Sequence, residues 1–186
     1  MGQPKQLLPL GDKTLVEHAL DNLLASQVGE VVVVTGNQAE AVVKKVGKRP
    51  VKVVMNPDYR LGMSTSLKKG LTSINKDAEG VMVVLADQPF IDAGLINRLI
   101  DEFTCRNKGI VVPVFQGKRG HPIILAIKYR DELLQLQGDA GAKAILERHP
   151  DDVLEVAVAG GQIHVDIDDM ESYELQKKKL EKRTDQ

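Results

Sequence analysis

Short apolar runs alternate along the chain with longer stretches in which apolar residues recur every three or four positions. The runs at residues 30–35, 51–55 and 81–87 contain many β-branched residues, which is typical of buried strands. The stretches between them have helical periodicity, and turns rich in glycine, proline and asparagine separate the two kinds of segment. This alternation predicts a parallel sheet that is covered by helices on both faces.

The later part of the chain adds strands of a different kind. Residues 110–115 and 122–127 flank a glycine-containing loop and predict a hairpin, and further strands are predicted at 153–158 and 163–167. The whole pattern predicts a single domain over residues 1–186. We expect it to be of the α/β class, with three α/β/α layers around a mostly parallel sheet.

Two of the predicted helices have a capping residue at their start. Thr14 precedes a stretch whose apolar residues fall on one helical face, and Asp92 precedes another such stretch. Hydroxyl and carboxylate side chains at this position accept hydrogen bonds from the free backbone N–H groups of the first turn. We therefore expect helices to begin immediately after these two residues.

An acidic residue stands at the end of one of the buried runs. Residues 81–85 lead through Ala86 into Asp87, and Pro89 ends the segment. Because proline cannot continue a central strand, Asp87 is expected at the carboxyl end of the strand, where open α/β sheets bind ligands. A carboxylate in that position needs a partner, and a divalent cation would be one. The alternative function for Asp87 is to cap the next helix.

Three further polar clusters are expected at the same edge of the sheet. They are residues 2–5, Asn56 together with residues 62–66, and Asp166 with Asp168. Hydroxyl groups at the start of a helix favour anion binding, although simple capping taken alone explains them better. Two carboxylates that lie two residues apart on a strand share a face and need a cation, a basic partner or solvent.

Charge and cysteine content narrow the possible functions. The 186 residues include 25 Lys+Arg and 26 Asp+Glu, giving a formal net charge of -1, which does not favour a nucleic-acid partner. Cys105 is the single cysteine, so no intrachain disulfide is expected, and we expect a reducing, cytoplasmic compartment. No apolar run approaches the ~20 residues of a membrane span, and the N-terminus is unlike a signal peptide.

Several common catalytic motifs are missing from the sequence. It contains no P-loop G-x-x-x-x-G-K-[ST], no dinucleotide-binding G-x-G-x-x-G, no H-E-x-x-H and no G-x-S-x-G. The four histidines, His18, His121, His149 and His164, do not have the spacing of a metal site. These absences argue against the commonest ATPases, dehydrogenases, metalloproteases and serine hydrolases.

Five separated motifs resemble those of the MobA-like nucleotidyltransferases. They are residues 1–10 (MGQPKQLLPL), 85–89 (LADQP), 117–122 (GKRGHP), 138–142 (GDAGA) and 166–168 (DID). The resemblance is greatest to the molybdenum cofactor cytidylyltransferase branch, of the MocA and PucB type. It implies the three-layer fold of the nucleotide-diphospho-sugar transferases.

The resemblance also implies a reaction. CTP would be joined to the molybdopterin form of the molybdenum cofactor, with Mg²⁺ as the metal and pyrophosphate as the second product. The molybdopterin cytosine dinucleotide would serve a xanthine-dehydrogenase-type enzyme in purine catabolism. Two alternatives stay open: a different phosphate acceptor, and a non-catalytic binding or assembly protein on the same scaffold.

The same resemblance implies roles for individual residues. Asp87 is expected to bind Mg²⁺ with help from Asp166 or Asp168, and Lys5 to act on the triphosphate as a catalytic point charge. The residues expected to contact the nucleotide are Gly2, Lys5, Asn56, Gly62, Ser64 and Ser66. The residues expected towards the acceptor are His121 and Asp139.

One departure from the family pattern concerns the N-terminal motif. In the family, a strand and a glycine-rich loop, L-A-A-G-x-S-x-R, precede the motif that here starts at Met1. That strand is central in the family's sheet, and its loop supplies backbone N–H groups to the triphosphate. Without them two strand edges are exposed, so we expect weak or absent turnover and self-association through the gap. Adding the strand and loop is expected to restore turnover.

Overall fold

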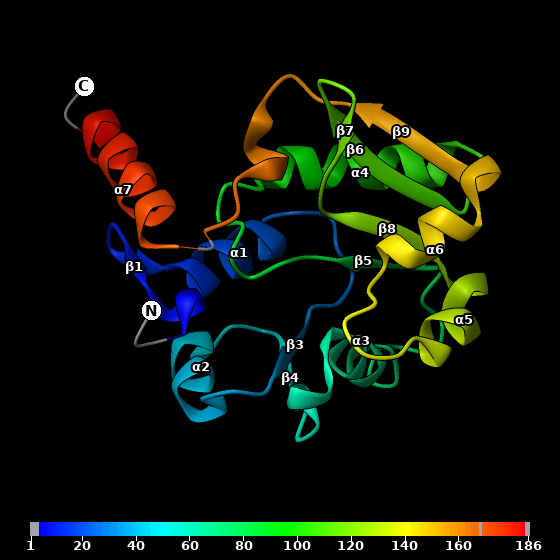
Figure 1. The fold of residues 1–186 in the computed structure, drawn as a ribbon, viewed down its shortest axis with the longest axis horizontal. Coiled ribbons are helices and arrows are strands. Elements are labelled where there is room, and N and C mark those ends of the chain that lie inside the picture. The colour runs from blue at the N-terminus through cyan, green and yellow to red at the C-terminus, as the bar shows by residue number, and fades with distance from the viewer. Residues whose placement is uncertain (1–3, 168, 185–186) are drawn as a thin grey trace.

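The computed structural model describes residues 4–167 and 169–184, and Figure 1 shows how its elements are arranged. The helices are α1 (Leu15–Leu24), α2 (Ala39–Val46), α3 (Met63–Leu71), α4 (Ala93–Cys105), α5 (Arg130–Gln135), α6 (Lys143–Arg148) and α7 (Met170–Thr184). The strands are β1 (Pro9–Leu10), β2 (Lys13–Thr14), β3 (Val32–Thr35), β4 (Lys52–Met55), β5 (Gly80–Val83), β6 (Ile110–Phe115), β7 (Lys118–Arg119), β8 (Ile123–Ala126) and β9 (Val153–Ala157).

The strands pair in three separate groups. The largest has the order β5-β8-β6-β7 with β9 beside β6, while β3 pairs with β4 and β1 pairs with β2. Among the residues that the structure describes, four of the six pairings are antiparallel and two are parallel. The α/β class is confirmed, but the expectation of mostly parallel pairing is wrong, because the late hairpin places β8 antiparallel between β5 and β6.

Helices cover both faces of the largest sheet, as the three-layer prediction expected (Figure 1). Along β6, Ile110 and Val112 pack on one face and Val111 on the other, as the two-residue period of a strand requires. The first face is covered by buried residues of α3, α5 and α6, which include Leu71, Leu133, Ile145 and Leu146. The second face is covered by buried residues of α4, namely Leu95, Ile96 and Leu99.

Both predicted helix caps are present. Thr14 and Glu17 form a capping box at the start of α1, in which the Glu17 carboxylate accepts a hydrogen bond from the Thr14 backbone N–H at 2.9 Å. The carboxylate of Asp92 accepts a hydrogen bond from the backbone N–H of Leu95 at 2.8 Å, at the start of α4. Since Asp92 caps the helix that follows Asp87, the alternative capping function of Asp87 is wrong.

Two strands that the sequence predicted as buried are only half-buried. The first three residues of β3 and all four of β5 are partly exposed, whereas the first three residues of both β6 and β8 are buried. β5 also ends at Val83 instead of continuing to Asp87. In the described part of the chain β3 pairs only with β4 and β5 only with β8, so each strand has one edge without a neighbour.

The last predicted strand, residues 163–167, is a turn of 3-10 helix at Gly161–His164 followed by irregular backbone. The Val165 N–H donates to the Gln162 carbonyl at 3.3 Å, so its hydrogen bond is local and does not reach another strand. Asp166 therefore lies on irregular backbone, and the predicted strand face that it was to share with Asp168 is wrong. Asp168 lies outside the described residues.

The C-terminal helix α7 lies beside the β1–β2 hairpin (Figure 1). Tyr173 packs with Leu8, Leu10, Leu15 and Ile167 in a small buried cluster, and its hydroxyl donates to the Pro9 carbonyl. These contacts anchor the charged tail helix to the N-terminal segment that precedes α1.

In the part of the chain that the structure describes, no helix combines the length and the apolar character needed to cross a membrane.

Candidate active site

Asp87 lies beyond the carboxyl end of β5, on the irregular segment that leads to α4. Its backbone carbonyl accepts a hydrogen bond from the Ile167 N–H at 3.2 Å. Its side chain is 16% exposed, and its Oδ2 is 2.5 Å from the Nζ of Lys5. The other oxygen, Oδ1, is buried and has no hydrogen-bond partner. A buried carboxylate oxygen without a partner is costly, which makes it a favourable position for a bound cation.

Gln88 links Asp87 to the second acidic residue. Its side chain is 2% exposed, and its Nε2 donates to Oδ1 of Asp166 at 2.5 Å. Its own Oε1 is buried without a hydrogen-bond partner. The Asp166 carboxylate is therefore held next to Asp87 by a buried amide. Sequence reasoning assigned no role to Gln88, because only the fold brings it to Asp166.

His121 lies close to both carboxylates. Burial lowers the pKa of His121 below its usual value, and Lys143 lowers it further, whereas the charges of Asp166 and Asp87 act to raise it. The net effect is a lowered pKa, which favours the neutral imidazole. A neutral imidazole can both donate and accept a hydrogen bond at this edge of the sheet.

A second group of the expected site residues surrounds the start of α3. Gly62 has a φ of +107°, which favours glycine, and it packs directly against the Gly138 carbonyl. The Ser64 N–H donates to that carbonyl at 3.0 Å, and the Met63 N–H donates to the Asp139 carboxylate at 3.3 Å. The two glycine-containing loops, 76 residues apart in the chain, thus form one unit through a backbone and a side-chain hydrogen bond.

Asn56 stabilises this unit through side-chain hydrogen bonds. Its side chain is 2% exposed, donates to the hydroxyls of Thr65 and Ser66 at 2.9 and 3.0 Å, and accepts from the Asp58 N–H at 3.0 Å. Ser64 is 1% exposed. The structure therefore shows Asn56 as a support for the loop. Direct contact of Asn56, Gly62, Ser64 or Ser66 with a nucleotide stays a prediction.

The expected site residues thus form two groups. Lys5, Asp87, Asp166 and His121 form the first group. Gly62, Asn56, Ser64, Ser66 and Asp139 form the second group. Ser66 of the second group lines a cleft together with Leu85 and Ala86, the two residues that precede Asp87. Gly2 lies outside the described residues.

The acidic residues suit a cation that keeps much of its own coordination shell. Within residues 4–167 and 169–184 there is no group of three or more His, Cys, Asp or Glu side chains that could enclose a metal. Mg²⁺ is typically bound by one or two carboxylates together with substrate phosphates and water. The unpartnered oxygen of Asp87, with Asp166 beside it, fits that donor set. The Lys5 ammonium is placed to contact phosphate oxygens bound to such a cation.

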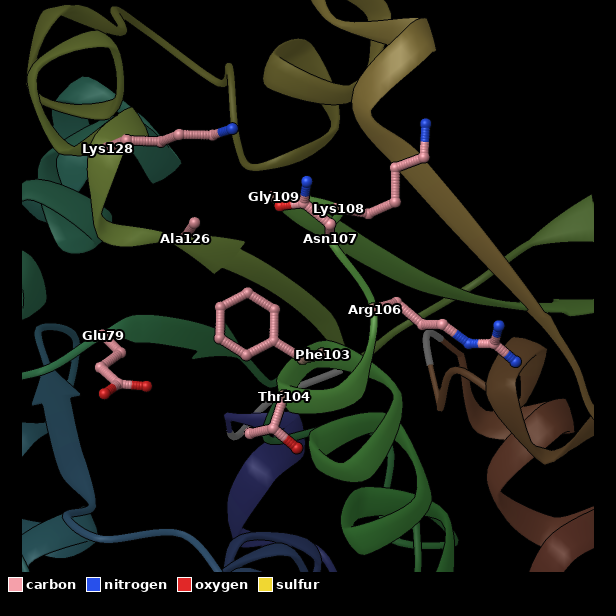
Figure 2. A pocket seen from close by; sticks show the side chains of 9 residues that line it. All are labelled: Glu79, Phe103, Thr104, Arg106, Asn107, Lys108, Gly109, Ala126 and Lys128. Carbon is pink, nitrogen blue, oxygen red and sulfur yellow. The ribbon is translucent and has the colours of Figure 1, made fainter.

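A smaller cavity of about 280 Å³ lies at Gly109, beside the N-terminal end of β6 (Figure 2). Three basic side chains line it, and each has a partner in the protein. Lys128 pairs with Asp152 at 2.7 Å, Arg106 pairs with Glu102 at 3.3 Å, and the Lys108 ammonium donates to a backbone carbonyl at 2.5 Å. Its three basic side chains are bound within the chain, so we assign them a structural role.

Asp152 beside this cavity gives a testable pH dependence. Burial would raise its pKa, but Lys128, the Tyr129 hydroxyl and the Gly109 N–H lower it to about 2 from the usual 3.8. A lowered pKa means that the charged carboxylate stabilises the fold above about pH 4, and that this stability is lost as the pH falls towards 2. Asp152→Asn should therefore lose about 2 kcal/mol at pH 7 and show a flatter loss of stability between pH 4 and 2 in urea unfolding.

The matched control is Asp151→Asn, because Asp151 takes part through its backbone carbonyl, which accepts from Lys108. This variant is expected to unfold like the unmodified chain at both pH values. Equal loss of stability in the two variants would contradict the role of the Asp152 carboxylate.

An α/β fold with a carboxylate, a lysine and a glycine loop at the ends of its strands is typical of proteins that bind nucleotides. The MobA-like NTP transferase domain matches residues 1–153, and the chain belongs to this family. It is 31% identical over 155 residues to the nicotine blue oxidoreductase of Paenarthrobacter nicotinovorans, covering 79% of this chain and 74% of that protein. It is 25% identical over 127 residues to the molybdenum cofactor cytidylyltransferase of Escherichia coli K12, covering 68% of this chain and 63% of that protein, which is less than two thirds.

Solved structures have the same fold. The homologue of Mycobacterium tuberculosis Rv0371c from Mycobacterium sp. strain JC1 superimposes with a TM-score of 0.88 at 32% identity, covering 98% of this chain and 90% of that chain. Rv0371c itself, in a complex with manganese, superimposes with a TM-score of 0.85 at 28% identity, covering 95% and 93%. The expected family and fold are confirmed. A divalent metal is bound by one of these related proteins.

Gln88 provides a test of metal binding that does not require turnover. Gln88→Leu removes the donor that holds Asp166. Substituting a residue that orients a metal ligand typically lowers the affinity for the metal 10- to 100-fold. We expect about tenfold weaker Mn²⁺ binding by calorimetry. Gln135→Leu, at an exposed position of α5, is the control and should bind Mn²⁺ as the unmodified chain does. Unchanged affinity in Gln88→Leu would show that Asp166 takes no part in holding the metal.

Proposed function

We propose that this chain transfers a cytidylyl group from CTP to the molybdopterin form of the molybdenum cofactor, giving molybdopterin cytosine dinucleotide and pyrophosphate. The observation that carries the proposal is the position of Asp87, with one oxygen on Lys5 and the other buried and unpartnered at the carboxyl end of a strand. Membership of an NTP transferase family and similarity to the E. coli molybdenum cofactor cytidylyltransferase support it.

Each residue of the site would have its own role in the transfer reaction. Asp87, with Asp166 beside it, would hold Mg²⁺, which when bound neutralises charge on the α-phosphate as the acceptor phosphate attacks in line. Lys5 would place its charge on the triphosphate. The loop and first turn of α3, with Asn56, Gly62, Ser64 and Ser66, would contact the nucleotide. His121 and Asp139 would lie towards the acceptor.

The setting of the reaction is part of the proposal. The product would be delivered in the cytoplasm to a xanthine-dehydrogenase-type apoenzyme, in keeping with a role in purine catabolism. The formal charge of -1 gives no reason to invoke a nucleic-acid partner.

The test is release of pyrophosphate from CTP or GTP with the molybdopterin cofactor, in the presence and absence of Mg²⁺. We expect release only with CTP, the acceptor and the metal together. Release with a sugar phosphate as acceptor would change the substrate assignment. Binding of CTP without release, both by this chain and by one extended with the family's strand and glycine-rich loop, would contradict the proposal and favour a binding or assembly protein.

A second candidate function is an oxidoreductase, because the relative from P. nicotinovorans bears that name at 31% identity. It makes a different expectation for the same preparation, namely a change in the absorbance of nicotine blue when a reductant is supplied, with no use of a triphosphate. Following that absorbance and pyrophosphate release side by side distinguishes the two functions.

A further inference from the structure

Residues 44–76 are strongly basic in a chain whose total charge is close to zero. They contain nine Lys or Arg residues against a single acidic residue, Asp58, which leaves a formal net charge of +8, whereas the whole chain has a charge of -1. The basic residues are Lys44, Lys45, Lys48, Arg49, Lys52, Arg60, Lys68, Lys69 and Lys76. A separation of charge of this size favours contact with an acidic partner.

The segment folds around the β3–β4 pair. α2 and α3 lie on either side of this pair (Figure 1), where Val42 and Val46 of α2 pack with Val33, and Gly70 of α3 lies against Val34. Because adjacent residues of a strand point to opposite faces, the two helices cover opposite faces of the pair.

Both helices end beside the start of β4. The last turn of each contains two lysines, and these are Lys44, Lys45, Lys68 and Lys69. The Lys52 ammonium, at the start of β4, donates to the carbonyl of Ser73, two residues beyond α3, at 2.5 Å. Lys48 lies in the loop that joins α2 to β4. The basic residues therefore gather at the amino end of β4, whereas Asn56 and its neighbours in the candidate site lie at the carboxyl end.

Most of these lysines have no acidic partner within the protein. Arg49 pairs with Asp21 at 2.6 Å and Lys45 pairs with Glu17 at 3.6 Å, so these two attach the end of α2 and the following loop to α1. Five exposed lysines form no ion pair with another residue that the structure describes. We call them the basic face, and they are Lys44, Lys48, Lys52, Lys69 and Lys76.

β4 also has a free edge beside the basic face. Within the described part of the chain it pairs with β3 alone, and the N–H groups of Lys52 and Asn56 donate towards that strand at 2.9 and 2.7 Å. Since N–H groups alternate in direction along a strand, those of Val53 and Met55 point to the free edge. The side chains of these two residues are 38% and 60% exposed. An edge of this kind can accept an added strand from another protein.

We propose that β4 and the basic face bind an acidic, extended segment of a partner protein, which adds to the free edge of β4 as a strand. Its backbone would pair with Val53 and Met55, its apolar side chains would cover theirs, and its carboxylates would pair with the basic face. The expected segment alternates acidic and apolar residues over about five positions. The proposal is independent of the reaction that the chain catalyses.

The composition of the surface argues against other partners. A second copy of β4 would bring Lys52 of each chain close to like charges, and lysine on an edge strand is a common means of preventing such self-pairing. Nucleic-acid sites typically add arginine and stacked aromatic rings to lysine. The single aromatic residue of the basic segment, Tyr59, lies against Gly36, and Arg49 is bound to Asp21.

The experiment adds two labelled peptides to the unmodified chain and follows their fluorescence anisotropy. The first alternates Glu and Val over about eight residues, long enough to span a typical strand. The second has the same sequence with a methyl group on every backbone nitrogen, which keeps the charge and blocks strand pairing. We expect saturable binding of the first peptide and at least about tenfold weaker binding of the second. Absent binding of the first, or equal binding of both, would overturn the proposal.

Hydrogen–deuterium exchange locates the bound peptide. Exchange at Val53 and Met55 should slow when the first peptide is added, because their N–H groups gain acceptors. Binding that leaves these two amides unchanged would place the peptide elsewhere and overturn the assignment to β4. Slow exchange of the same amides in a dimer of the chain alone, shown by sedimentation, would assign the edge to a second copy.

A matched pair of charge reversals tests the basic face. Lys48→Glu/Lys69→Glu should weaken binding of the first peptide at least about tenfold, since both substitutions place like charges beside it. Arg98→Glu/Lys178→Glu changes the net charge equally at exposed positions of α4 and α7 and should retain binding. Equal losses in the two variants would show that only the total charge matters and would overturn the basic face.

Two further probes identify the class of partner. A single-stranded DNA oligonucleotide and vesicles of phosphatidylcholine with phosphatidylserine are compared with the first peptide. We expect both to bind more weakly, because neither can pair with the edge of β4. Tighter binding of the oligonucleotide or of the vesicles would overturn the assignment to a protein partner.

Discussion

Asp87→Asn is expected to lower pyrophosphate release by about a thousandfold, the scale on which a single group that stabilises transition-state charge contributes. Asparagine keeps the shape of the side chain but loses the charge that Lys5 and a divalent cation would share. We also expect the affinity for CTP in the presence of Mg²⁺, measured by calorimetry, to fall at least about tenfold. The binding measurement reports on the site even where turnover is slow.

Asp92→Asn is the matched control for Asp87. Asp92 lies on the same segment, but its carboxylate accepts a hydrogen bond from the Leu95 N–H at the start of α4. Loss of its charge should cost up to about 1 kcal/mol of stability and leave transfer and CTP binding unchanged. An Asp87→Asn variant that retains more than a tenth of the activity would remove Asp87 from the centre of the reaction.

Gly62→Ala should produce the second large effect, a loss of about 2–3 kcal/mol in the free energy of unfolding. The backbone at Gly62 has a φ of +107°, and an added Cβ would collide with the Gly138 carbonyl and lie 2.9 Å from the Asp139 nitrogen. The Gly138–Asp139 loop would have to move away, breaking its hydrogen bonds to residues 63 and 64. Urea unfolding measures the loss, and we expect CTP binding to weaken with it.

Two other glycines separate backbone strain from the collision. Gly138 and Gly117 have φ of +59° and +74°, and an added Cβ at either would meet nothing within 4 Å. Alanine at these positions should cost about 1 kcal/mol, the penalty of the left-handed backbone alone. If all three variants lose the same stability, the contact between the two loops is unimportant.

Local sequence signals predicted the parts of the fold that depend on neighbours in the chain. The caps at Thr14 and Asp92 and the helices that follow them are confirmed. Which strands pair depends on residues far apart in the chain, and the apolar pattern of β5 does not say that β8 lies beside it in the antiparallel sense. The strand predicted at residues 163–167 is wrong, because alternating residues there form local turns instead of a ladder.

The candidate site could be predicted from the sequence only in part. The apolar run ending in an acidic residue placed Asp87 near the end of its strand, and the structure brings Lys5 to it. The burial of Asn56 and Ser64 could not be predicted, because polar residues in a loop are usually exposed. Gln88 carries no chemical signal in the sequence, and only its contact with Asp166 shows its importance.

The ion pair between Lys5 and Asp87 has a consequence for the order in which ligands bind. A cation bound at the other oxygen of Asp87 weakens the attraction between that carboxylate and Lys5, and a triphosphate beside it offers Lys5 a second anion. Each ligand therefore lowers the free-energy cost of binding the other, and this thermodynamic coupling is reciprocal. Substituting Lys5 with Met should tighten the binding of Mn²⁺ alone and weaken the binding of CTP, so the synergy between metal and nucleotide is encoded in a single side chain.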